Sequence, residues 1–319
     1  MEWYLVIIIF IASCLVLSWL SSRLVQSVVQ IAKYLRWREF IIAFFVIGMA
    51  ASLPNLFIDL NAALQGKPEL AFGDIIGGNL VDLTLVLAIA VFFSKKGLSA
   101  EGNMVQTSAL FTAGIALLPL FLIVDSSLNR LDGLILIGTF MMYSLWLFSK
   151  KERFRKAYRS DLGHVVLDFK QFLWNVVKVI ILLGLLLAAS QVVISSAEFF
   201  SQKLGISLAL VGILIVGLGN AFPETYFAII SARKNENWLV LGDLMGSVIV
   251  CSTLVLGIIA LAAPFQITNL APFLTARIFL IAASILSLIF IKSGKKITKT
   301  EGLILLTLYV VFLIVEVFI

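Results

Sequence analysis

Residues 48–87 read GMAASLPNLFIDLNAALQGKPELAFGDIIGGNLVDLTLVL, and a diverged copy of this segment returns later in the chain. The copy, residues 217–256, reads GLGNAFPETYFAIISARKNENWLVLGDLMGSVIVCSTLVL. Pro54 matches Pro223 at an offset of 169 residues (223 − 54). Without any gap, the same offset matches Gly48 with Gly217, Gly73 with Gly242, Asp74 with Asp243, Gly77 with Gly246 and Thr84 with Thr253. Identical residues at a fixed offset, several of them proline and glycine, indicate an internal repeat.

The composition is that of a membrane protein. Of the 319 residues, 61% are hydrophobic and only 13% are charged. Apolar runs of about 20 residues, enough to cross about 30 Å of hydrocarbon, recur along the whole chain. The sequence therefore predicts an all-α polytopic membrane protein with ten transmembrane helices. The expected spans are residues 3–32, 39–65, 69–93, 104–124, 130–149, 171–201, 206–232, 237–263, 270–291 and 300–318.

Targeting and disulfide signals are weak in this sequence. The first span has no basic flank before it and no small-residue cleavage site after it, so we interpret it as a transmembrane helix and not as a signal peptide. The two cysteines, Cys14 and Cys251, both lie in apolar segments, and no disulfide is expected.

Basic residues alternate between the connections of the expected spans. One set of connections holds most of them: Lys33, Arg36, Arg38, Lys95, Lys96, the cluster from Lys150 to Arg159, Arg233, Lys234, and the lysines from Lys292 to Lys299. The positive-inside rule places this set in the cytoplasm and both termini outside. Topology thus explains the net charge of +6, and nucleic acid is not an expected partner. With no appended domain in view, we expect a prokaryotic plasma membrane.

The repeat divides the chain into two halves of five spans each. Residues 1–149 form the first half, residues 150–170 form a basic cytoplasmic connector, and residues 171–319 form the second half. An odd number of spans makes the second half enter the membrane upside down. The sequence therefore predicts two inverted five-helix repeats with broken central helices and a binding site near the midplane.

Proline and glycine interrupt the second and seventh spans at matching positions. A proline inside a helix removes one backbone N–H, so Pro223 is expected to free the carbonyl of Gly219. Gly48 and Gly217 lie just before the two prolines and loosen the same regions. Free carbonyls at membrane depth are tolerated where they line a cavity, and oxygen ligands suit Na⁺ and Ca²⁺. The alternative to a binding site is a kink that serves only helix packing. Two breaks at matching positions of the repeat favour the binding site over this alternative.

Acidic residues at membrane depth cost about 2.5–3.5 kcal/mol each and are functional by default. Glu224 follows Pro223 in the seventh span, and Asp82 lies midway along the third. Asp59 lies one turn beyond Asn55 on the same face of the second span. Glu224 and Asp82 are the principal candidates, and Asp59 is a further one.

Two other acids, Asp74 and Asp243, lie nearer the ends of their expected spans. For them a helix N-terminal cap is an equal alternative to a role in a site. Neutral oxygens that accompany the acids are Ser52, Asn55, Asn79, Thr84, Asn220, Ser247 and Thr253. Serine and threonine in membrane helices often only bond back to their own helix. Ser52, Asn55 and Ser247 flank the breaks, which favours a role in binding.

These residues resemble the paired α-repeats of the Ca²⁺/cation antiporter superfamily, in particular those of the prokaryotic sodium/calcium exchangers. The family pattern is G-T-S-L-P-E in the second and seventh spans, followed by G-N-x-x-G-S-N in the third and eighth. The counterparts here are ASLPN at residues 51–55, NAFPE at 220–224, GDIIGGN at 73–79 and GDLMGSV at 242–248. The resemblance covers the whole chain in span number, orientation and repeat.

The resemblance implies a cation centre between these four spans, with several departures from the pattern. The family has a glutamate after each proline, whereas this chain has Asn55 in the first half and Glu224 in the second. Four residues after the family's serine, where exchangers commonly have Asn or Asp, stand Asp82 and Cys251. The acids of the centre are therefore reduced to two, which still suffice to neutralise one Ca²⁺.

The separate Na⁺ sites of the family have lost hydroxyl groups in this chain. The serine of the second motif is Gly78 in the first half, although Ser247 keeps it in the second. The threonine of the first motif is Ala51 in one half and Asn220 in the other. The expected metal ligands are Glu224, Asp82, Asn55, Ser52, Ser247, Gly48 and Gly217, with Asn220, Cys251, Asp59, Asp74 and Asp243 as further candidates.

We expect a secondary-active cation antiporter that exchanges Ca²⁺ against Na⁺ by alternating access. Inorganic cations and the lipid bilayer are the expected partners, no cofactor is expected, and the oligomeric state, including a monomer, is left open. One alternative is a proton-coupled or other-cation exchanger of the same fold. A second is a transport-dead membrane scaffold. An enzyme is not expected, because the single histidine, His164, lies in the basic connector and no catalytic set lies within the spans.

Overall fold

The structure is a computed structural model that describes residues 3–34, 52–149, 169–235, 237–267 and 269–318. Within these residues, eight helical stretches are long and apolar enough to cross a membrane. They are Trp3–Leu24, Pro68–Phe93, Val105–Asp125, Arg130–Leu147, Gln171–Leu204, Leu208–Arg233, Leu239–Ala262 and Ala271–Lys292. The expected second span is described only from residue 52 onward, and the expected tenth coincides with α16 (Lys299–Phe318). The count of ten stays a prediction.

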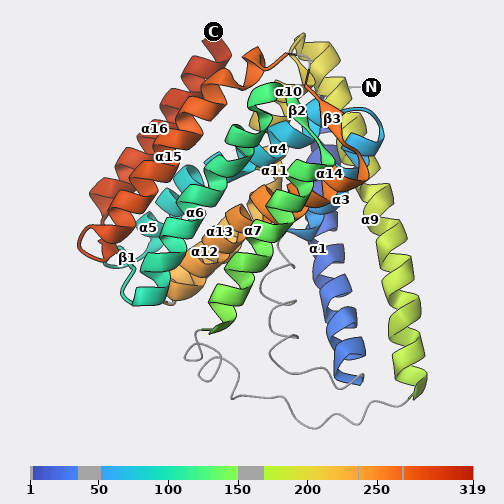
Figure 1. The fold of residues 1–319 in the computed structure, drawn as a ribbon, viewed down its shortest axis with the longest axis horizontal. Helices are drawn as coiled ribbons and strands as arrows, with labels where there is room; N and C mark the ends of the chain where they lie inside the picture. Colours follow the sequence, from blue (N-terminus) through green and yellow to red (C-terminus); the bar gives the residue numbers. More distant parts are fainter. Residues whose placement is uncertain (1–2, 35–51, 150–168, 236, 268, 319) are drawn as a thin grey trace.

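The first half of the chain is a series of helices joined by short connections (Figure 1). In order, its elements are α1 (Trp3–Tyr34), α3 (Leu53–Leu64), α4 (Pro68–Val81), a π-helical turn (Asp82–Val86), α5 (Leu87–Phe93), β1 (Leu98–Ser99), α6 (Asn103–Leu122), a 3-10 turn (Ile123–Asp125), β2 (Ser127–Leu128) and α7 (Arg130–Ser149). Alpha-helices α4 and α5 thus form one span that the π-helical turn interrupts.

The second half repeats most of this order of elements. After α9 (Phe169–Leu204) come α10 (Leu208–Val211), a π-helical turn (Gly212–Val216), α11 (Gly217–Asn220), α12 (Phe222–Arg233), α13 (Asn237–Val250), a π-helical turn (Cys251–Val255), α14 (Leu256–Ala262), β3 (Phe265–Gln266), a 3-10 turn (Ala271–Phe273), α15 (Leu274–Lys292), β4 (Lys296–Ile297) and α16. The bounds of α3, α4, α5 and α7 recur exactly 169 residues later in α12, α13, α14 and α16. So do the bounds of the π-helical turn that begins at Asp82.

Equivalent elements also exchange packing partners between the halves. Helix α5 packs against α16, and α14, the equivalent of α5, packs against α7, the equivalent of α16. Antiparallel pairs join β1 to β4 and β2 to β3, so each pair holds one strand from each half. Gly133 approaches the Gly257 backbone, and the matching Gly302 packs against Val91. The halves are therefore interlocked and are not separate bodies.

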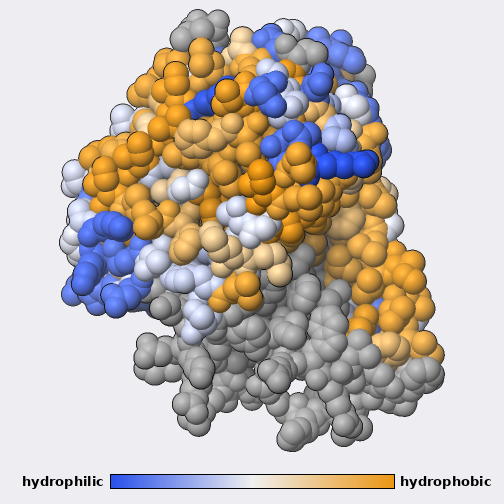
Figure 2. All heavy atoms as spheres, viewed as in Figure 1, coloured by the Kyte–Doolittle hydropathy of each residue, from blue (hydrophilic) through white to orange (hydrophobic). Residues whose placement is uncertain are grey.

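Helices α1 and α9 lie side by side at one edge of the molecule (Figure 1). The Phe10 and Phe200 rings meet edge to face at a centroid distance of 5.7 Å. The outer faces of both helices carry exposed apolar side chains such as Ile8, Trp174 and Ile180. Figure 2 shows this apolar surface over much of the molecule, with hydrophilic side chains gathered at opposite ends. Such a surface fits a lipid environment.

Glycines let α4 approach the segment from α10 to α11 backbone to backbone. A Cβ added at Gly217 would lie 2.7 Å from the Gly78 nitrogen, and one added at Gly77 would overlap the backbone of Ile213. Small residues allow this close crossing in membrane helices. The sequence suggested that Gly217 loosens its helix, but the structure uses it for close packing. The glycines at this crossing are Gly73, Gly77, Gly212 and Gly217.

Candidate functional site

The break before Pro223 sets the position of the central side chains. Helix α11 ends at Asn220, and α12 begins at Phe222 with Pro223 in its first turn. The prediction of a free carbonyl at Gly219 is wrong, because a backbone N–H at the end of α11 donates to this carbonyl. The tighter last turn supplies this donor. The break instead places Glu224 in the first turn of α12, directed into the interior of the protein.

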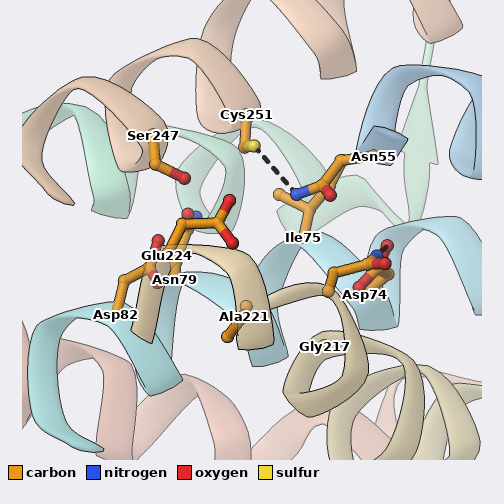
Figure 3. A pocket seen from close by; sticks show the side chains of 12 residues that line it. Asn55, Asp74, Ile75, Asn79, Asp82, Gly217, Ala221, Glu224, Ser247 and Cys251 are labelled. Atoms are coloured by element: carbon orange, nitrogen blue, oxygen red, sulfur yellow. Dashed lines mark hydrogen bonds between the residues drawn. The ribbon is translucent and has the colours of Figure 1, made fainter. Parts of the chain in front are cut away.

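A small cavity lies where α3, α4, α11, α12 and α13 meet (Figure 3). Its volume is about 10 Å³, which is enough for about one water-sized particle. Its lining is polar: three carboxylates, three asparagines, a serine and a cysteine converge on it. The lining residues are Asn55, Asp74, Ile75, Gly78, Asn79, Asp82, Gly217, Asn220, Ala221, Glu224, Ser247 and Cys251.

Glu224 and Asp82 lie at one end of this cavity, next to Ser247 and Asn79 (Figure 3). The Glu224 side chain is only 5% exposed and its Oε2 atom has no hydrogen-bond partner. Asp82 is 4% exposed and interacts with Ser247, which lines the same end of the cavity. The Asn79 Nδ2 atom donates to the Ser252 Oγ atom at 2.7 Å, so its amide oxygen stays available. Two carboxylates and several neutral oxygens are thus held together away from water.

Asn55 and Cys251 face each other across the cavity. The Asn55 Nδ2 atom donates to the Cys251 Sγ atom at 3.3 Å, and the Asn55 Oδ1 atom has no partner. Cys251 is the first residue of the π-helical turn Cys251–Val255. Its equivalent in the first half, Asp82, is the first residue of the π-helical turn Asp82–Val86. Such turns add one residue to a helix turn and are frequent at functional sites. They place these two equivalent side chains on the same cavity.

Asp74 lies at the other end of the cavity. The Asn220 Nδ2 atom donates to the Asp74 Oδ2 atom at 2.7 Å. Asp59, on α3, lies within hydrogen-bonding reach of Asp74 but does not line the cavity itself. Both aspartates are almost completely buried.

The alternative of a helix cap is wrong for both Asp74 and Asp243. Helix α4 begins at Pro68 and α13 at Asn237, so each aspartate is the seventh residue of its helix. The starts of both helices agree with the expected spans to within one residue, so Asp74 and Asp243 lie about two turns inside their helices and not at the first turn. Asp243 is half-buried and stays outside the cavity lining, although its charge lies near Asp82 and Glu224.

The expected ligands divide into three groups. Those that line the cavity are Glu224, Asp82, Asn55, Ser247, Gly217, Asn220, Cys251 and Asp74. Ser52 is buried beside Cys251 but does not line the cavity. Asp59 and Asp243 do not line it either. Gly48 lies outside the described residues. Within the part of the chain that is described, no group of three or more His, Cys, Asp and Glu side chains has a geometry that could hold a metal ion.

Sequence reasoning missed Ile75 and Ala221 as lining residues. Both are apolar and carry no chemical signal of their own. Ile75 lies one helical turn before Asn79, a spacing that could have placed it on the same face. Ala221 holds the turn between α11 and α12.

The break before Pro223, the interlocked halves and the buried polar cavity agree with a comparison against known families. The family model described as sodium/calcium exchanger protein matches residues 5–149 and 174–318. This chain belongs to that family. Its members are membrane exchangers and not enzymes, and the chain is a multi-pass membrane protein of the Ca²⁺/cation antiporter superfamily.

Bacterial and archaeal proteins are among the relatives of this exchanger-family chain. It is 27% identical over 315 residues to CaxA of Alkalimonas amylolytica, covering 96% of this chain and 97% of that protein. It is 23% identical over 342 residues to the sodium/calcium exchanger MaX1 of Methanosarcina acetivorans, covering 92% and 93%. The H⁺/Ca²⁺ exchanger CAX has a similar fold, with a TM-score of 0.74 at 18% identity, over 97% of this chain and 82% of that one.

Proposed function

We propose that this protein exchanges Ca²⁺ against Na⁺ across the membrane by alternating access. One observation carries the proposal: the Glu224 and Asp82 carboxylates share a buried cavity with the side chains of Asn55, Asn79 and Ser247. Carboxylate and amide oxygens are the ligands that Ca²⁺ takes in proteins. The sodium/calcium exchanger MaX1 is among its relatives. Two carboxylates match the charge of one Ca²⁺.

Glu224 and Asp82 are proposed as the principal ligands. The Glu224 Oε2 and Asn55 Oδ1 atoms are buried without partners, a costly state that a bound cation would relieve. Ser247 and Asn220 add neutral oxygens at the two ends of the cavity, and the backbone of Gly217 lines it. Ser52 and Gly48 are proposed as outer members of the set, on the family pattern alone.

The proposed architecture is ten transmembrane helices in two inverted five-helix repeats, 1–149 and 171–319, joined by the connector 150–170. The constant offset of 169 residues between element bounds supports it, as does the exchange of packing partners between the halves. An inverted repeat places a site near the midplane, where its two broken helices meet. The cavity next to α11, α12 and α3 has that location in the repeat.

Charge balance supplies the coupling between the two ions. Glu224 and Asp82 cannot both stay ionised at membrane depth unless a cation or protons compensate them. The empty site is therefore too costly to reorient, whereas the loaded site can. Helices α1 and α9, which pack mainly against each other, are proposed to slide past the central bundle and open the cavity to each side in turn.

Exchange against H⁺ is the second candidate for this function. Two departures favour it: Gly78 and Asn55 replace the hydroxyl and carboxylate that the family pattern places in the first half. A site with fewer Na⁺ ligands leaves the two carboxylates as carriers of protons. The fold of this protein is also similar to that of the H⁺/Ca²⁺ exchanger CAX.

Uptake of radioactive Ca²⁺ into proteoliposomes tests the proposal, with an imposed Na⁺ gradient, an imposed pH gradient, or neither. Uptake that only the Na⁺ gradient drives supports Ca²⁺/Na⁺ exchange. Uptake that only the pH gradient drives replaces it with the proton-coupled candidate. No uptake under either gradient contradicts both and favours another cargo or a transport-dead scaffold.

The role of Glu224 is tested in the same assay with Glu224→Gln. Removing this carboxylate leaves Asp82 as the single acid at this end of the cavity, too little charge there to compensate Ca²⁺. Uptake should therefore fall by at least about 100-fold, as expected for the loss of about 3 kcal/mol. Glu101→Gln is the matched control, because Glu101 is exposed, lies just after β1 and does not line the cavity. A Glu224→Gln protein that exchanges at the normal rate would show that the site lies elsewhere.

A further inference from the structure

A second pair of acids lies beside the cavity but apart from Glu224 and Asp82. Asp59 on α3 and Asp74 on α4 lie within hydrogen-bonding reach of each other. Asp59 is 0% exposed and Asp74 is 1% exposed. Two carboxylates in contact repel one another unless something positive lies between or beside them.

Apart from the approach of the two carboxyl groups to each other, three oxygen atoms of this pair have no hydrogen-bond partner. They are Oδ1 and Oδ2 of Asp59 and Oδ1 of Asp74. The fourth, Oδ2 of Asp74, accepts the hydrogen bond from Asn220, which fixes the direction of the Asp74 carboxylate. Buried oxygens of this kind are usually bonded, so three together point to a missing positive partner.

No basic side chain supplies that partner in the described part of the chain. Its buried polar residues include no Lys or Arg. The ion pair recorded there joins Lys67 to Glu198 and involves neither aspartate. The two negative charges are thus uncompensated by the protein itself.

We propose that Asp59 and Asp74 form a second cation site, oriented by Asn220, that takes a hard divalent cation such as Ca²⁺. Carboxylate oxygens suit such ions, and two carboxylates match the charge of one divalent ion. The site is distinct from the Glu224–Asp82 pair, which lies at the other end of the cavity. It goes beyond the proposed exchange and does not depend on it.

The position of Asp59 explains why the site occurs in the first half of the repeat and has no counterpart in the second. Asp59 lies four residues after Asn55, which is one turn or about 6 Å along α3. It therefore restores a carboxylate one turn away from the place where the family pattern has its glutamate. In the second half the equivalent residue is Ala228, which is also fully buried. Asp243, the equivalent of Asp74, accordingly has no such partner.

Equilibrium binding of radioactive Ca²⁺ to the purified full-length protein in detergent tests the site without any transport step. We expect two Ca²⁺ ions per chain in the wild type and one in Asp59→Asn. We expect one in Glu224→Gln and none in the double variant. Asp125→Asn is the control: Asp125 is exposed, and asparagine keeps the acceptor for the Ser127 N–H. Its stoichiometry should stay at two.

The outcomes separate this site from the central one. If Glu224→Gln still binds one Ca²⁺ and Asp59→Asn removes it, the second site stands even if no variant transports. Asp74→Asn should give the same loss, which guards against a folding defect peculiar to Asp59→Asn. If Glu224→Gln abolishes all binding in a folded protein, or if Asp59→Asn leaves the stoichiometry unchanged, the second site is overturned and bound protons balance the pair.

Discussion

Asn55 is the residue at which the central cavity departs most from the paired pattern of the family. Its amide donates to Cys251 across the cavity, so two neutral side chains occupy places that the resemblance assigns to acidic or amide ligands. The Oδ1 atom of Asn55 remains available inside the cavity. Position 55 thus brings no charge to the cavity, where the family pattern has a glutamate.

Asn55→Glu should raise the affinity for Ca²⁺. The new carboxylate adds a third charge to Glu224 and Asp82 at the cost of the hydrogen bond to Cys251. We expect a dissociation constant lower by about tenfold, or about 1.4 kcal/mol, in equilibrium Ca²⁺ binding. The control is Asn55→Gln, which changes size without adding charge. Unchanged affinity in Asn55→Glu would mean that position 55 does not face the bound ion.

At the scale of elements, the crossing of α4 over α10 and α11 fixes the cavity. Gly77 faces the Ile213 backbone so closely that any Cβ would overlap it. Overpacking of a tight contact costs about 1–3 kcal/mol. The crossing holds Asp74 and Asn79 against Asn220, so it stabilises both the fold and the site.

Gly77→Ala should therefore lower the thermal midpoint of the detergent-solubilised protein, by on the order of 5 °C. The two backbones must separate, because neither partner is a flexible side chain. Gly114→Ala is the matched control, since a Cβ at Gly114 on α6 would meet nothing within 4 Å. Equal midpoints in the two variants would contradict the argument that backbone contact at Gly77 stabilises the protein.

Gly219 links the broken helix to α1. A Cβ there would lie 2.8 Å from the Cζ atom of Phe10. The ring can turn away, so Gly219→Ala should fold normally but alter the contact along which α1 is proposed to slide. We expect Ca²⁺ uptake slower by about threefold to tenfold, and recovery in the double variant with Phe10→Ala. Wild-type uptake by Gly219→Ala would indicate that α1 does not move against α11.

The elements themselves were predictable to different degrees. The apolar runs and the break at Pro223 follow directly from composition and from the geometry of proline. The π-helical turns at Asp82 and Cys251 did not, because one extra residue in a turn leaves no mark on hydropathy. The role of Gly217 also needed the structure, since a glycine that loosens a helix and one that admits a neighbour look alike in sequence.

At the scale of the whole molecule, the repeat made most of the site predictable. Matching one half against the other singled out Glu224, Asp82, Asn55 and Ser247, and all four line the cavity. The contact between Asp59 and Asp74 was not foreseen, because it depends on how α3 packs on α4. The sequence left a helix cap as an equal alternative for Asp74, because hydropathy does not show which side chains near the end of a span are buried by neighbouring helices.

The orientation of the whole molecule is open to a direct test. The pair β1–β4 lies at the end of the molecule next to lysines such as Lys95 and Lys296, and β2–β3 lies at the opposite end, toward the N and C marks (Figure 1). The positive-inside rule places the first end in the cytoplasm. On this prediction both chain termini are outside.

Single cysteines at the two ends should react with a membrane-impermeant maleimide from opposite sides. In right-side-out vesicles, Gln266→Cys on β3 should be labelled, whereas Glu101→Cys near β1 should be labelled only after permeabilisation. Both positions are exposed. The wild type is the control, because its Cys14 and Cys251 are buried and should stay unlabelled. Labelling of Glu101→Cys in intact vesicles, with Gln266→Cys protected, would reverse the predicted topology.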